Sequence, residues 1–89
     1  MEEKITNEQV IYMLFIVQRF QTELLEKGVQ MSINAYTNDN GTWFAYCAGV
    51  PDKYINGYCY NFRTFDENRE EFSAFKEKVK IVYLNDLFL

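Results

Sequence analysis

The sequence predicts an α+β fold: a long N-terminal helix, a three-stranded antiparallel β-meander and a C-terminal helix (α-β-β-β-α), with both helices packed on one face of the sheet. Apolar residues recur at helical spacing near both ends of the chain and with a period of two between them. Aromatic residues make up 18% of the 89 residues, which is typical of a chain that folds and not of a disordered one. The length predicts a single small globular domain over residues 1–89.

The first helix is predicted over residues 6–27, because both of its ends carry cap signals. Thr6 and Gln9 have the spacing of a capping box, and Gly28 suits the left-handed position that ends many helices. Between the caps, apolar residues at helical spacing predict one buried stripe: Val10, Met13, Leu14, Val17, Phe20 and Leu24.

The first two strands are predicted to form a hairpin. Residues 29–37 alternate between apolar and polar, and the turn-forming residues 38–41 connect them to a second strand that ends before Pro51. Pairing across so short a turn places Tyr46 on the face towards the helices and Trp43 on the opposite, outer face.

The third strand is predicted over residues 58–65. We expect its more aromatic set to face the helices: Tyr58, Tyr60 and Phe62. Cys47 and Cys59 then lie on neighbouring strands, and we expect them to be small, half-buried and reduced side chains. The alternative is a redox pair on a shared face of the sheet.

A second helix is expected to begin at Asp66 or Asn68, since acidic residues follow in its first turn. Phe72 and Phe75 keep the helical spacing, and no Gly or Pro ends the helix before Asn85. The alternative is a fourth strand over residues 79–84, which are rich in β-branched side chains.

Residue types in the chain exclude several kinds of chemistry. No histidine occurs, so the commonest general base and the commonest metal ligand are missing, and two cysteines do not make a structural zinc site. We therefore expect no catalytic residues, no metal and no cofactor, and a protein that is not an enzyme. A small enzyme of an unfamiliar type is the alternative.

The charge of the chain limits its partners. The net charge is −4 and the sequence pI is about 4.7, so binding to nucleic acid by phosphate neutralisation is not expected. The longest apolar run, residues 10–17, is shorter than the ~20 residues that span a bilayer. No secretory signal is recognised at the N-terminus, so we expect no membrane association and a cytoplasmic protein.

A first candidate interaction surface lies on the first helix. Ile11, Tyr12 and Phe15 fall away from the main apolar stripe, and a helix that is apolar nearly all round is usually covered on both sides. The second helix or the C-terminal residues 87–89 would cover them within the chain. Otherwise they form a homodimer or partner interface.

A second candidate lies on the outer face of the sheet. Tyr36 and Trp43 are expected to be cross-strand neighbours there with Arg63 nearby, and these residue types are enriched at binding hot spots. The alternative is an aromatic pair that only stabilises the hairpin.

The densest acidic cluster offers a third candidate, a docking patch for a basic partner. The alternative is a capped and solvated helix start. Its members are Asp66, Glu67, Glu70 and Glu71.

These observations together favour a small acidic non-enzymatic protein–protein interaction domain of the adaptor or inhibitor type. Self-association through the first helix would make it a homodimer, and its protein partner is unknown. The alternative function is a ligand- or single-strand-binding module that uses the exposed aromatic face of the sheet.

Overall fold

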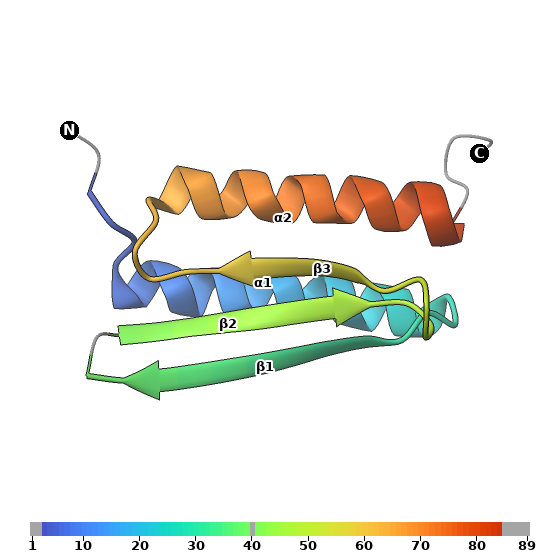
Figure 1. Cartoon of the computed structure of the whole chain (residues 1–89), viewed down its shortest axis with the longest axis horizontal. Helices are drawn as coiled ribbons and strands as arrows, with labels where there is room; N and C mark the ends of the chain where they lie inside the picture. Colours follow the sequence, from blue (N-terminus) through green and yellow to red (C-terminus); the bar gives the residue numbers. More distant parts are fainter. Residues whose placement is uncertain (1–2, 40, 85–89) are drawn as a thin grey trace.

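The computed structural model describes residues 3–39 and 41–84 and confirms the α-β-β-β-α order. The helices and strands are arranged along the chain as Figure 1 shows: α1 (Asn7–Glu26), β1 (Met31–Asn38), β2 (Gly41–Ala48), β3 (Ile55–Cys59), α2 (Phe65–Val79) and a π-helical segment η1 (Lys80–Leu84). Within the described residues, no helix is long and apolar enough to cross a membrane.

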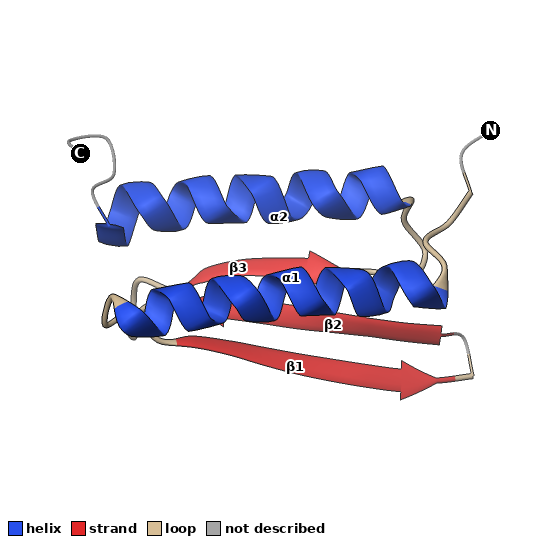
Figure 2. Cartoon of the chain, turned by 180° about the vertical axis from the view of Figure 1, so that it is seen from behind, coloured by secondary structure: helices blue, strands red, loops and turns tan. Residues whose placement is uncertain are grey.

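The strands form one antiparallel sheet in the order β1-β2-β3, and both helices lie on the same side of it (Figures 1 and 2). The core fills the space between the sheet and the helices, and no helix of the described residues covers the other face of the sheet. Core residues come from all elements except η1 and β1, and the largest fully buried ones include Met13, Val17, Leu24, Phe44, Tyr46, Phe75 and Val79.

Helix α1 has the predicted caps. The Gln9 backbone N–H donates to Thr6 Oγ1 at 3.1 Å, and the Thr6 N–H donates to Gln9 Oε1 at 3.0 Å. Gly28 has a φ of +80°, the left-handed conformation expected after a helix. Thr6 and Lys27 are the cap residues on either side of Asn7–Glu26, so the predicted helix over 6–27 is confirmed.

The facing of the β1–β2 hairpin is also confirmed. Tyr36 is paired with Trp43 and Ala35 with Phe44. Phe44 is completely buried against the helices, whereas Trp43 is half-buried on the outer face. A short hairpin fixes which residues are opposite each other, and alternation along the strand then fixes the face.

The prediction for β3 was wrong in both its bounds and its facing. The strand covers Ile55–Cys59, and Cys59 is buried while Tyr58 points to the outer face. The physical reason is Gly57, which pairs with Tyr46: a Cβ at Gly57 would collide with the Tyr46 ring, so only glycine admits that ring over the strand. This pairing sends the neighbouring Tyr58 to the other side.

The facing of β3 also separates the two cysteines. Cys47 pairs with Asn56 on the outer face, and Cys59 pairs with Phe44 on the inner face. The two thiols therefore lie on opposite faces of the sheet, and the alternative of a redox pair on a shared face is wrong.

Helix α2 begins earlier than predicted. Its N-cap is Thr64, neither Asp66 nor Asn68, and Thr64 forms a capping box with Glu67 through two hydrogen bonds of 3.1 Å. The chain stays helical through η1, so residues 79–84 are not a strand. The predicted cover by residues 87–89 lies outside the described residues.

Candidate interaction surface

Five aromatic rings form a continuous layer on the outer face of the sheet, which we call the aromatic face. The rings of Tyr36 and Trp43 stack with centroids 4.4 Å apart, and Trp43 lies 6.3 Å from Tyr60. Tyr60 in turn has Tyr58 stacked at 5.4 Å and Phe62 stacked at 4.8 Å. All three strands and the segment after β3 thus contribute to one surface.

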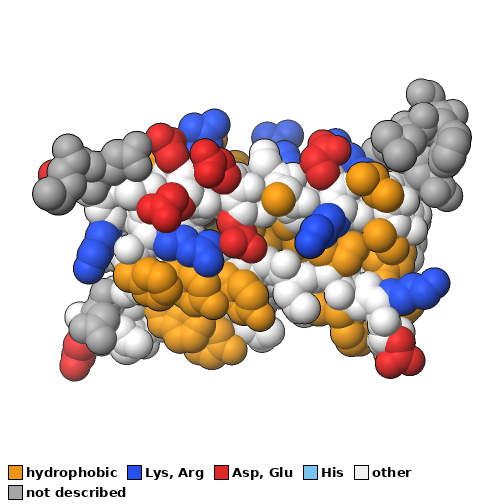
Figure 3. Space-filling model, turned by 45° about the horizontal axis from the view of Figure 1, so that its top comes forward, with side chains coloured by type: hydrophobic (Ala, Val, Ile, Leu, Met, Phe, Trp, Pro, Cys, Tyr) orange, Lys and Arg blue, Asp and Glu red, His pale blue; other side chains and the backbone are white. Residues whose placement is uncertain are grey.

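The aromatic face is open to solvent although it is apolar. Phe62 is 61% exposed and Tyr36 is 46% exposed. Figure 3 shows hydrophobic side chains gathered in one large patch at the lower left, bordered above by basic and acidic side chains. A contiguous exposed apolar patch with a charged rim is typical of a binding surface.

A buried asparagine fixes the position of Tyr60 in the aromatic face. Asn68 is 0% exposed, and its Oδ1 accepts from the Tyr60 backbone N–H at 2.8 Å. Its Nδ2 donates to the Tyr60 carbonyl at 3.1 Å and to the Thr64 carbonyl at 2.9 Å. The first turns of α2 are therefore hydrogen-bonded to the backbone just beyond β3. These bonds hold Tyr60 in position, as pairing with a neighbouring strand would.

Arg63 links the aromatic face to α2 through Tyr60 and Glu71, and its place near Tyr36 and Trp43 stays a prediction. Its guanidinium carbon lies 4.6 Å from the centroid of the Tyr60 ring, and its Nη1 donates to Glu71 Oε1 at 2.9 Å. The side chains of this ion pair are 25% and 32% exposed, so solvent screens it only in part. Arg63 is thus a rim residue whose charge is already matched.

Three of the four acidic residues at the start of α2 have partners within the chain. The hydrogen bond that Glu67 accepts from the Thr64 backbone lowers the pKa of this capping carboxyl. Glu71 is paired with Arg63, and Asp66 lies 4.0 Å from Arg69. The side chains of Asp66 and Arg69 are 66% and 59% exposed, so solvent screens this pair, and a docking patch for a basic partner stays a prediction.

The candidate residues of α1 point in two directions. Tyr12 lies edge-on to Phe65 of α2 at 5.9 Å, on the side of α1 that faces α2. Ile11 and Phe15 are 64% and 63% exposed, so α2 does not cover them. The structure therefore separates Tyr12 from the other two and leaves Ile11 and Phe15 on a second open surface.

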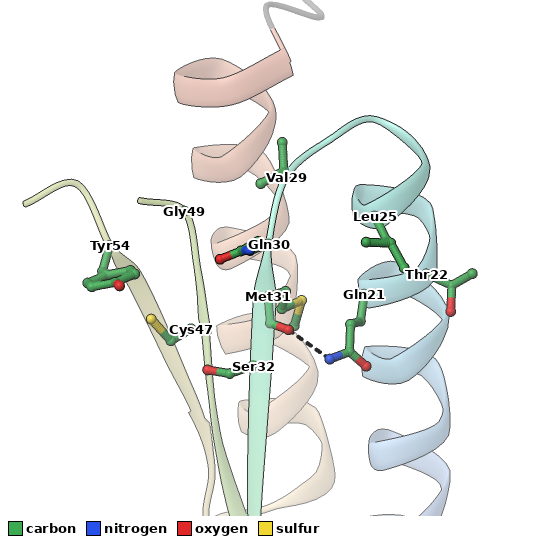
Figure 4. A pocket seen from close by; sticks show the side chains of 10 residues that line it. All are labelled: Gln21, Thr22, Leu25, Val29, Gln30, Met31, Ser32, Cys47, Gly49 and Tyr54. Carbon is green, nitrogen blue, oxygen red and sulfur yellow. Dashed lines mark hydrogen bonds between the residues drawn. The ribbon is translucent and has the colours of Figure 1, made fainter. Parts of the chain in front are cut away.

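A surface hollow of about 380 Å³ lies around the start of β1 (Figure 4). Gln21 of α1 reaches into this region and donates from Nε2 to the Met31 carbonyl at 2.7 Å. None of the lining residues is Lys, Arg, Asp or Glu, and burial raises the pKa of the Cys47 thiol. The hydroxyl and thiol groups of the lining belong to Thr22, Ser32, Tyr54 and Cys47.

The second cysteine, Cys59, lies in the core. Burial raises the pKa of Cys59 to about 12, so its thiol stays protonated at neutral pH. Within residues 3–39 and 41–84, no three Cys, Asp or Glu side chains are placed to hold a metal ion.

Sequence reasoning missed three contributors to the aromatic face: Tyr58, Tyr60 and Phe62. Their alternation was clear, but the loop before β3 does not fix the face as a short hairpin does. Gly57 was the sequence feature that could have indicated the facing of β3, because a glycine inside a strand often marks a close approach of another side chain. Asn68 was recognised only as a possible cap.

Comparisons of the chain with protein-family models, with curated proteins and with solved structures gave no match, so the geometry of the aromatic face carries the functional argument.

Proposed function

We propose that this protein is a small acidic, non-enzymatic protein–protein interaction domain of the adaptor or inhibitor type, and that it binds its partner through the aromatic face. The observation that carries the proposal is the stacked, solvent-exposed layer of Tyr36, Trp43, Tyr58, Tyr60 and Phe62. We place the protein in the cytoplasm, which suits two free cysteines that lie on opposite faces of the sheet.

Preorganisation of the rings supports a binding role. A side chain that is ordered on binding loses about 0.5–1.5 kcal/mol of conformational entropy. Here Tyr36 is already stacked on Trp43, and Tyr60 is held between its neighbours and by Asn68. A partner would therefore bury large apolar area without first ordering the surface.

The stacking favours a protein partner over a single-stranded nucleic acid. Bases bind by stacking on open ring faces, but the inner rings of this layer already face one another. Arg63 is paired with Glu71, and the chain has a net charge of −4. What the layer offers is ring edges and tyrosine hydroxyls, which suit apolar and hydrogen-bonding side chains of a protein.

Quantitative capture from host extract tests the proposal when wild type is compared with Phe62→Ala. Tyr54→Ala is the matched control, because Tyr54 is also an exposed aromatic residue (53%) but lies in the loop before β3. A genuine partner should be retained by the control and weakened about tenfold or more by Phe62→Ala.

Two results would contradict this function. One is a set of captured proteins that Phe62→Ala leaves unchanged. The other is salt-sensitive binding of a single-stranded oligonucleotide by wild type, lost in Phe62→Ala, which would favour the nucleic-acid alternative.

A further inference from the structure

One side of the molecule combines an open strand edge with an uncharged helix surface. We call it the α1–β1 flank and define it by Leu14 of α1 and by Ile33, Ala35 and Thr37 of β1. Gln21 and Met31 join the two elements at one end, and α1 and β1 spread apart towards the start of the helix (Figure 2). Ala35 and Thr37 are exposed there, although the neighbouring Phe44 is fully buried.

The β1 backbone has unpaired groups along this flank. β1 borders the sheet, and the bond from the Gly49 N–H to the Gln30 carbonyl shows which residues face β2. In an antiparallel ladder the alternate residues then direct their N–H and C=O groups away from β2. Those residues are Met31, whose carbonyl is capped by Gln21, and Ile33, Ala35 and Thr37, for which the described residues provide no cap.

This edge lacks the usual protection against pairing. Edge strands are commonly blunted by a charged residue, a proline or a bulge. β1 is Met31–Asn38, contains neither a charged residue nor proline, and pairs with β2 in an unbroken register over all eight residues. A further strand can therefore add to it without displacing anything.

The side of α1 next to β1 also lacks charged residues. The charged residues within the helix are Glu8, Arg19, Glu23 and Glu26. At 100° per residue, each of them lies about 120° or more around the helix from Leu14. The side of α1 next to β1 is therefore free of charge, whereas its other sides are not.

We propose that the occupant of the α1–β1 flank is a second copy of this chain. The two copies join β1 to β1 antiparallel about a two-fold axis at Ala35, which pairs Ile33 of each copy with Thr37 of the other. The result is one six-stranded sheet with the two α1 helices on the same side. This arrangement uses all the open backbone positions and places the side of each α1 that carries Leu14 towards the other copy.

The charge pattern favours a second copy over a different protein. Two copies of a chain with net charge −4 repel each other, so a self-association surface must be free of charge, as this flank is. A basic partner would gain nothing here, because the acidic residues of α1 lie on other sides.

Sedimentation and native mass measurement test the proposal on the full chain. Wild type should have twice the chain mass of 10.7 kDa and fall to one chain mass on dilution. Ala35→Lys places two ammonium groups beside the axis and should weaken self-association about tenfold or more while the circular dichroism stays unchanged. Ala74→Lys is the matched control, the same change at an exposed alanine of α2, and should leave the dimer intact.

Amide hydrogen exchange locates the interface without any variant. The N–H groups of Ile33, Ala35 and Thr37 should exchange slowly in concentrated protein and rapidly in dilute protein. A chain that stays monomeric in concentrated solution would overturn the proposal. So would a dimer that Ala35→Lys leaves intact, equal weakening by both lysine variants, or exchange at these amides that does not depend on concentration.

Discussion

At the residue scale, the least satisfied group in the core is the hydroxyl of Tyr46. Its ring packs at 4.7 Å on Phe75 and at 5.8 Å on Phe72, and it is 2% exposed. The hydroxyl is buried, and no hydrogen-bond partner for it is found among the described residues. Burial also raises its pKa, so it remains a neutral phenol at physiological pH. The ring therefore stabilises the core, whereas the oxygen does not.

Tyr46→Phe should accordingly raise the free energy of unfolding by ~1 kcal/mol, because it removes a desolvated hydroxyl and keeps the ring. Urea denaturation of the two proteins measures the difference. A variant less stable than wild type would mean that the hydroxyl has a hydrogen bond, for example through a buried water.

At the element scale, β2 separates folding from binding, since its residues alternate between the core and the aromatic face. Tyr46→Ala should lower the free energy of unfolding by about 3–5 kcal/mol through loss of a buried aromatic ring. Trp43→Ala removes a half-buried ring and should lower the stability much less while weakening partner binding. Thermal unfolding of both variants is the check, and a greater loss for Trp43→Ala would contradict the assignment of faces.

Two phenylalanines of helix α1 also differ in their roles, since Phe20 lies in the core and Phe15 on the surface. Phe20 is 4% exposed and lies edge-on to Phe72 and Phe75, so Phe20→Glu should bury an unpaired charge and unfold the domain. Phe15 is 63% exposed on the side of α1 away from the sheet, so Phe15→Glu should leave the domain folded. Circular dichroism and sedimentation on both variants distinguish these results. An unfolded Phe15→Glu would point instead to a cover within the chain.

The elements also show which features can be predicted from sequence. The caps of α1 and the facing of the β1–β2 hairpin depend on residues close together in the chain, so local rules were sufficient. The N-cap at Thr64 had the same kind of signal, since Glu67 follows three residues later, but nearby acidic residues fit an N-cap equally well. The facing of β3 depends on Gly57 lying under the Tyr46 ring. The glycine indicates a close approach, but the local sequence does not show which side chain approaches it.

At the scale of the whole molecule, stability rests on one apolar core without covalent or metal cross-links among the described residues. A reductant or a metal chelator should therefore leave the melting temperature unchanged. Calorimetry with and without each reagent is the measurement. A decrease of several degrees in either case would reveal a disulfide or a metal that stabilises the fold.

The position of β1 at the border of the sheet has one consequence for affinity. If two sheets join along β1, the two aromatic faces lie side by side on the surface away from the helices, with Tyr36 of each nearest the axis. A partner that contains the recognised segment twice would then bind its second site as an intramolecular step. Avidity of this kind can exceed the single-site affinity by about 10²–10⁴-fold. The assembly would thus select repetitive or dimeric partners over monomeric ones, although the affinity of each single site stays the same.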